Sequence, residues 1–187
     1  MKHPIAARMD QLVPSGIRKV NERALAMERA GEKVLHFEIG RPDFDTPAYI
    51  KRAAMNKIHQ HNTTCAPSFV QWAAIAALRD EGDEVEKMVR EYQRRRDCAV
   101  KAINDIPGLS CLCPKGAFYL FINCKALGRP SAELAQYLLE KAKIALVPGD
   151  VFGRGGEGYL RMSFANSYET IVEGCRRLAE AAAALRK

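Results

Sequence analysis

The C-terminal half of the sequence constrains the fold most, because short apolar segments alternate there with segments of helical period. The short segments are LSCLC, GAFYLFINC, IALVPG and GYLRMSF, and Pro or Gly lies beside each of them. Residues 131–143 and 167–187 instead carry apolar residues at helical spacing. Short strands between amphipathic helices predict an α+β, two-layer fold, in which helices cover a small antiparallel or mixed sheet.

Composition narrows the class of protein. The chain has 187 residues, of which 48% are hydrophobic and 27% are charged, so it can form one domain with its own core. No apolar run is long enough to cross a membrane, and the N-terminus lacks a secretory apolar region. The six cysteines are scattered, which is typical of buried thiols in a reducing compartment. We therefore expect a cytoplasmic protein without a membrane partner.

The net charge of +7 raises the question of nucleic-acid binding. The densest basic cluster is RRR at residues 94–96, within a long predicted helix. Three consecutive helical residues spread over about 200° of the helix surface, which suits a solvated face better than a phosphate-binding stripe. We expect no nucleic-acid partner and retain that class only as an alternative.

The strand GYLRMSF carries one unexplained charge. Alternation places three apolar side chains on one face and three polar ones on the other, namely Leu160, Met162 and Phe164 against Tyr159, Arg161 and Ser163. The planar guanidinium of Arg161 suits a carboxylate, either of a ligand or of a neighbouring Asp or Glu in a structural salt bridge. Gly40 ends the predicted strand KVLHFEIG, so its main chain can approach a ligand closely.

Other candidate chemistry does not form a site. His59, His61 and Cys65 lie close in sequence, but no second cluster completes the four ligands of a zinc site. The glycines of VFGRGGEG match no phosphate-binding motif and predict a flexible surface loop. The segment FVQWAAIAAL predicts a buried helix. From the residues alone, no metal site and no catalytic constellation stands out.

Several motifs nevertheless resemble one family, the fold-type-I, pyridoxal-phosphate (PLP)-dependent aminotransferases of class I/II, in the aspartate-aminotransferase-like subgroup. They occur in the order of that family and cover nearly the whole chain: PSGIRKV, IGRPDFDTP, NTTCAPSFVQWAAIAAL, EYQRRRD, PKGAFYLF, ALVPGDVFG and GYLRMSFANS. The resemblance implies transfer of an amino group between an amino acid and a 2-oxo acid, with PLP as cofactor and a homodimer as the complete enzyme.

The resemblance also assigns roles to individual residues. Arg161 and the main chain of Gly40 would bind the substrate α-carboxylate, and Ile17 and Ile39 would line the substrate side. Asn62 and Thr63 would approach the active site of the partner subunit. These assignments come from the family's motifs and not from spacing or periodicity.

The sequence departs from the family at its cofactor. It contains no N-P-x-N-P-T-G, no Asp-x-x-Tyr and no Ser-x-x-Lys, the motifs that hold PLP in the family's large domain. We therefore predict a single small domain, residues 1–187, built from 1–54 and 55–187, with the large-domain insertion absent at about 53–55. We expect this chain alone to contain no catalytic residue, to bind no PLP and to be inactive. The alternative is a stand-alone carboxylate-binding or regulatory module without catalysis.

Overall fold

The computed structural model describes residues 15–52, 67–79 and 82–186. These residues fall into two compact units, one within Met1–Arg41 and Arg95–Lys187 and the other within Pro42–Arg94. Each unit is described by itself. The mixture of helices and short strands confirms the α+β prediction.

The first unit contains two small sheets. In the larger one, β5 (Tyr159–Ser163) is central and pairs antiparallel with β2 (Tyr119–Asn123) and with β4 (Val147–Pro148). In the smaller one, β1 (Leu35–His36) pairs parallel with β3 (Ile144–Ala145). The second pairing ties the N-terminal segment to the C-terminal half of the chain.

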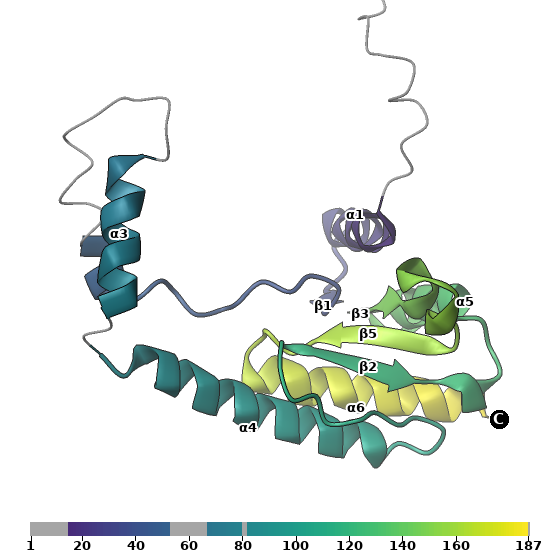
Figure 1. Cartoon of the computed structure of the whole chain (residues 1–187). Helices are drawn as coiled ribbons and strands as arrows, with labels where there is room; N and C mark the ends of the chain where they lie inside the picture. Colours follow the sequence, from purple (N-terminus) through teal and green to yellow (C-terminus); the bar gives the residue numbers. More distant parts are fainter. Residues whose placement is uncertain (1–14, 53–66, 80–81, 187) are drawn as a thin grey trace, which may run out of the picture. The chain divides into compact units, whose positions relative to one another are not determined.

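Helices cover one face of these strands. The unit contains α1 (Gly16–Arg29), the end of α4 (Glu84–Asn104), α5 (Ser131–Tyr137) with the π-helix η3 (Leu138–Ala142), and α6 (Tyr168–Leu185). Its described residues also form the 3-10 helices η2 (Lys125–Leu127), η4 (Gly149–Phe152) and η5 (Arg154–Gly156). Figure 1 shows α6 running beneath β2 and β5 with the end of α4 beside it. One face of the β2–β5 pair therefore lies on helices.

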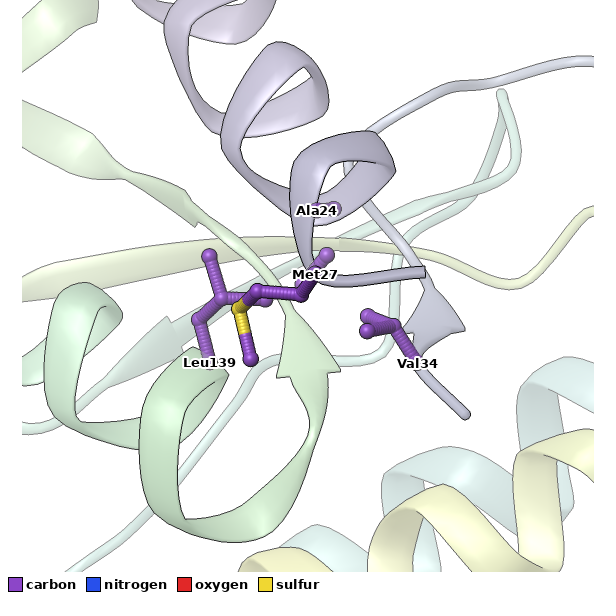
Figure 2. Packing of buried hydrophobic residues seen from close by; sticks show 5 residues of the cluster. Ala24, Met27, Val34 and Leu139 are labelled. Atoms are coloured by element: carbon purple, nitrogen blue, oxygen red, sulfur yellow. The ribbon is translucent and has the colours of Figure 1, made fainter. Parts of the chain in front are cut away.

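The buried side chains of the core recur at the spacing that the sequence pattern predicted. On β2 and β5 the buried side chains alternate, and Leu120, Ile122, Leu160 and Met162 are all almost fully buried. A second cluster fixes α1, whose Ala24 and Met27 pack with Val34, Leu139 and Ala145 (Figure 2). This packing holds α1 against η3 and β3 and so places the segment that follows β1.

Gly174 of α6 allows a close contact between this helix and Phe37. A Cβ atom there would lie 2.5 Å from Cζ of the fully buried Phe37, well inside van der Waals contact. The Phe37 ring therefore rests directly on the main chain of α6. The residues that follow Phe37, Glu38 to Gly40, are held at a fixed height above the helix layer.

The second unit is smaller. Residues 48–52 are helical, α3 spans Ser68–Arg79, and α4 begins at Glu84. The rings of Phe44 and Tyr92 meet edge to face, 5.2 Å apart. The prediction that the apolar segment of α3 is buried is wrong for this chain, because no residue of α3 is buried and Trp72 is 47% exposed. An apolar helix needs a covering layer to be buried, and the described residues do not bury any residue of α3.

Two other local predictions differ from the structure. LSCLC forms no strand among the described residues, since only Ser110 pairs with Asn123 in an isolated bridge. VFGRGGEG forms two 3-10 turns in place of a flexible loop. A Cβ at Gly149 or at Gly156 would collide with the main chain of the other, so the absence of side chains lets the two turns pack together.

Candidate functional site

The strand β5 presents Arg161 on the sheet face opposite the helix layer, as the alternation predicted. Arg161 is half-buried and lies directly across from Phe121 of β2. The neighbours Leu160 and Met162 point into the core. Ser163, predicted on the polar face, is nevertheless fully buried, and its main-chain N–H donates to the carbonyl oxygen of Phe37.

The guanidinium of Arg161 is held by a main-chain oxygen and two aromatic rings. Nη2 donates to the carbonyl oxygen of Glu38 at 2.5 Å, and the guanidinium carbon lies 4.4 Å from the centre of the Tyr119 ring and 5.1 Å from that of Phe152. Nε is buried and has no hydrogen-bond partner among the described residues. Contacts of this kind hold a cation in place without neutralising it.

The alternative of a structural salt bridge is not what the structure shows. Within the described residues, no Asp or Glu side chain forms an ion pair with Arg161. Burial lowers the pKa of Arg161, while Tyr119 and the charge of Glu38 oppose this effect. The group nevertheless stays cationic, because the pKa of arginine lies far above neutrality. The sheet face therefore carries a positive charge with which no described carboxylate forms a direct ion pair.

Gly40 lies beside the same tyrosine. A Cβ atom at Gly40 would overlap the hydroxyl of Tyr119 and lie 2.7 Å from Cε2 of Phe118. Only glycine allows the main chain to pass this close to the two rings. Gly40 and Arg161 thus flank Tyr119, and the structure brings together the two residues that the sequence assigned to one carboxylate.

The other predicted site residues have fewer contacts in common with Arg161 and Gly40. Ile39 follows Glu38 and is 44% exposed, and Ile17 is half-buried near the start of α1. A Cβ at the adjacent Gly16 would collide with Val151. That contact places the start of α1 beside the turn that carries Phe152. Asn62 and Thr63 lie outside the described residues, as do the metal candidates at 59–65 and the predicted junction at 53–55.

Sequence reasoning missed the buried carboxylate behind Arg161. The side chain of Glu38 is fully buried, and its Oε1 accepts a hydrogen bond from Asn21 Nδ2 at 2.8 Å and lies 2.7 Å from His36 Nδ1. The other ring nitrogen of His36 lies 3.2 Å from Glu28 Oε1. The sequence HFE at residues 36–38 contained a signal for this contact, because residues two apart in an extended segment share a face, which places His36 beside Glu38.

These carboxylates govern the charge of His36. Burial opposes protonation of the ring, but the hydrogen bonds and charges of Glu38, and then of Glu28, outweigh it. The net result is that the pKa of His36 is raised above its usual value. The cluster therefore favours a positively charged His36.

Ser131 fixes the start of β5. Ser131 is the first residue of α5, and Pro130 occupies the N-cap position before it. The Ser131 hydroxyl accepts hydrogen bonds from the main-chain N–H groups of Gly158 and Tyr159, at 2.7 and 3.2 Å. This buried hydroxyl joins α5 to the strand that carries Arg161.

The described residues offer no cofactor anchor of the kind that PLP needs. A Schiff base forms on an uncharged lysine, usually held in a desolvated pocket. Every described lysine is exposed except Lys143, which is half-buried and ion-paired with Glu32. No group of three or more His, Cys, Asp or Glu side chains in this part of the chain could hold a metal ion. The residues that are described therefore do not fit PLP.

Three of the described cysteines, Cys111, Cys124 and Cys175, are not activated nucleophiles. Burial raises the pKa of the Cys111 and Cys124 thiols to about 11, and that of Cys175 to about 12. Thiols with such pKa values are protonated at neutral pH. The basic cluster on α4 does not form a phosphate stripe either, because Arg95 is buried while Arg94 and Arg96 pair with acidic neighbours. No helix among the described residues is long and apolar enough to cross a membrane.

Comparison with known proteins identifies the family. The family model for aminotransferase class I and II matches residues 48–178. The chain therefore belongs to the class I and II aminotransferases. The aspartate aminotransferase of Pyrococcus abyssi is 45% identical over 126 residues, which is 66% of this chain and 32% of the relative.

Solved structures agree with this result. An aspartate aminotransferase from Thermus thermophilus with maleate matches 96% of this chain and 100% of its own with a TM-score of 0.80, at 15% identity, which shows a shared fold. A PLP-bound structure from Clostridium difficile 630 matches 62% of this chain and 30% of its own with a TM-score of 0.58, at 31% identity. The chain spans about a third of the length of the curated relatives that it matches.

Proposed function

We propose that this chain is the small domain of a PLP-dependent aminotransferase and that it binds the α-carboxylate of the amino-acid or 2-oxo-acid substrate. One observation carries the proposal: Arg161 is a fixed, half-buried cation without a carboxylate partner among the described residues, and it lies beside the closely packed main chain of Gly40. A carboxylate arriving there would complete the coordination of the guanidinium.

The geometry of the Arg161 guanidinium, a planar fork of N–H donors, supports this role. Arginine offers parallel N–H donors that match the two oxygens of a carboxylate, and the rings of Tyr119 and Phe152 fix its plane. A charge-assisted pair of this type contributes about 1.5–3 kcal/mol. In the complete enzyme, closure of this domain would bring Arg161 and the Gly40 turn onto the substrate and exclude water.

The same proposal assigns the cofactor to another part of the enzyme. PLP would act as the electron sink of the reaction, and the Schiff-base lysine would come from the large domain. The described lysines do not fit that role, and the sequence has no Ser-x-x-Lys. We therefore infer that the chain alone neither retains PLP nor catalyses transamination. Absorbance of bound PLP that survives dialysis would contradict this inference.

The homodimer and the cytoplasmic location stay predictions. The exposed apolar side chains of α3, namely Val70, Trp72, Ile75 and Leu78, support a covering layer in the complete enzyme. The described part of α4 gives the nucleic-acid alternative no support, since its arginines are buried or paired.

The test is carboxylate binding by the full 187-residue chain. L-aspartate and L-phenylalanine serve as probes, and NMR signals of the Arg161 Nε–H and the Gly40 amide report binding. Both probes should shift both signals with similar affinity, because the site reads the shared α-carboxylate. An amino-acid amide, which lacks that carboxylate, should leave the signals unchanged.

Arg161→Lys is the decisive variant. It keeps the charge and removes the planar fork, so the affinity should fall by part of the pair energy above, whose complete loss would correspond to about 10- to 150-fold. Arg154→Ala is the matched control, because Arg154 is exposed on the neighbouring turn η5. Equal binding by the Arg161→Lys variant and the wild-type chain would refute the proposed role of Arg161.

A further inference from the structure

The carboxylate of Glu38 is close enough to Arg161 to compete with a substrate for its charge. The main-chain oxygen of Glu38 already accepts from Arg161 Nη2, and the Glu38 charge acts on the guanidinium. Two atoms here are buried without partners, Oε2 of Glu38 and Nε of Arg161, one an acceptor and the other a donor. A site that binds carboxylates thus contains an internal carboxylate of its own.

His36 is placed to neutralise that internal carboxylate. Its Nδ1 lies 2.7 Å from Glu38 Oε1 and its Nε2 lies 3.2 Å from Glu28 Oε1. A neutral imidazole has only one N–H, so one nitrogen would then present a lone pair to a carboxylate oxygen. The doubly protonated ring alone donates to both oxygens. The geometry itself therefore selects the charged form of His36.

The charges around this cluster can be listed by element. Helix α1 contributes Glu28 and the neutral Asn21, and β5 contributes Arg161. The partners of β1 on β3 are the apolar Ile144 and Ala145, and Lys143 just before them pairs with Glu32. With His36 charged, His36 balances Glu38, and Arg161 keeps its positive charge for a ligand. With His36 neutral, Arg161 is the cation of this cluster that remains for the buried Glu38.

We propose that His36 is a positioning residue of the carboxylate site, whose proton engages Glu38 and thereby leaves Arg161 free to bind the substrate carboxylate. The inference rests on the proposed role of Arg161. Substrate binding should be strongest when His36 is charged and should weaken as the pH rises through its titration. By linkage, a bound carboxylate must stabilise the charged ring in return.

The raised pKa of His36 agrees with this direction. The titration should therefore fall above the usual pKa of histidine, and affinity should decline on its alkaline side. One unpaired charge a few ångströms beyond the guanidinium should change the affinity by about tenfold.

The experiment uses the full chain and L-aspartate between pH 5.5 and 9. The ring signals of His36 give its titration, and the Arg161 Nε–H and Gly40 amide signals give the affinity. We expect affinity to follow the His36 titration. The ratio of affinities on its two sides should equal the ratio of the His36 acid constants with and without L-aspartate.

Two variants separate charge from structure. His36→Gln should bind about tenfold more weakly at pH 6 and lose the pH dependence, because Glu38 is left without its cation. Adding Glu38→Gln to it should restore tight binding at all pH values, because the competing charge is gone. Arg23→Gln is the matched control, since this exposed α1 residue pairs with Glu140 away from the cluster.

The outcomes distinguish the two proposals. No binding at any pH would refute the carboxylate site and this inference with it. Binding that ignores the His36 titration, or a double variant no better than His36→Gln, would refute only the role of His36. Restored affinity in the double variant would exclude a merely structural effect, which a second substitution in the cluster would worsen.

Discussion

Gly40→Ala tests the close approach on which the carboxylate site depends. The added methyl would overlap the Tyr119 hydroxyl, and Cε2 of Phe118 would have to retreat from 2.7 Å to at least 3.4 Å to reach ordinary contact. The clash involves ring atoms carried by β2 and its preceding residue, which cannot rotate away without leaving their packing. Overpacking of this kind costs about 1–3 kcal/mol.

The same movement should weaken the site. Tyr119 supports the guanidinium of Arg161 at 4.4 Å, and a displaced ring would release one side of it. We therefore expect the Gly40→Ala chain to unfold at lower urea and to bind L-aspartate more weakly. Urea unfolding should be followed by the amide NMR signals of β2 and β5, because the one tryptophan, Trp72, lies in the other unit.

Gly155→Ala is the matched control, since a Cβ there meets open space. Adding Tyr119→Phe to the Gly40→Ala chain removes the hydroxyl overlap and should recover part of the stability. An unchanged unfolding midpoint for Gly40→Ala would refute the packing argument. Normal stability with weakened binding would instead show that the methyl blocks the ligand directly.

Two further predictions concern the supports of the site. Ser131→Ala leaves the main-chain donors of Gly158 and Tyr159, at the start of β5, without this acceptor and should destabilise the chain by about 1–3 kcal/mol in urea unfolding. Ser131→Thr, which keeps a hydroxyl, should lose less. The ionic contacts of His36 should stabilise the chain fully below about pH 6.5, its usual pKa when unfolded, and this contribution should be lost as the pH rises through the raised pKa of the folded state. A His36→Gln chain should lack that part of the pH dependence, and an identical pH profile would contradict the assignment.

The sequence predicted the elements whose pattern is local. The period of two in residues 159–163 placed Leu160 in the core and Arg161 outside it. The helical spacing of apolar residues in 167–187 likewise predicted α6, which buries one face. Both results depend only on which face of one element is apolar. The motifs added the pairing of Arg161 with Gly40, which no periodicity could supply.

The predictions that failed share a physical cause, since each depended on which other segment of the chain packs against the one in question. LSCLC is apolar enough for a strand, but only Ser110 finds a partner on β2. The glycines of residues 153–158 suit a mobile loop and equally a tight main-chain contact, and the structure has the second. The apolar α3 indicates burial but not what buries it. The burial of Glu38 was not predicted, because a buried acid depends on hydrogen-bond partners such as Asn21, and the sequence does not show which residues will lie beside it.

The hydrogen bond between Arg161 and Glu38 also sets an order of events during synthesis. Its two residues lie 123 positions apart in the chain. At about 5–20 residues per second, the ribosome needs roughly 6–25 seconds to deliver the second after the first. Throughout that interval Glu38 has no Arg161 to meet, and β1 lacks β3 until residue 145 has been made. The cluster of Asn21, His36 and Glu38 is thus made early, and the carboxylate site cannot form before Arg161 has been added.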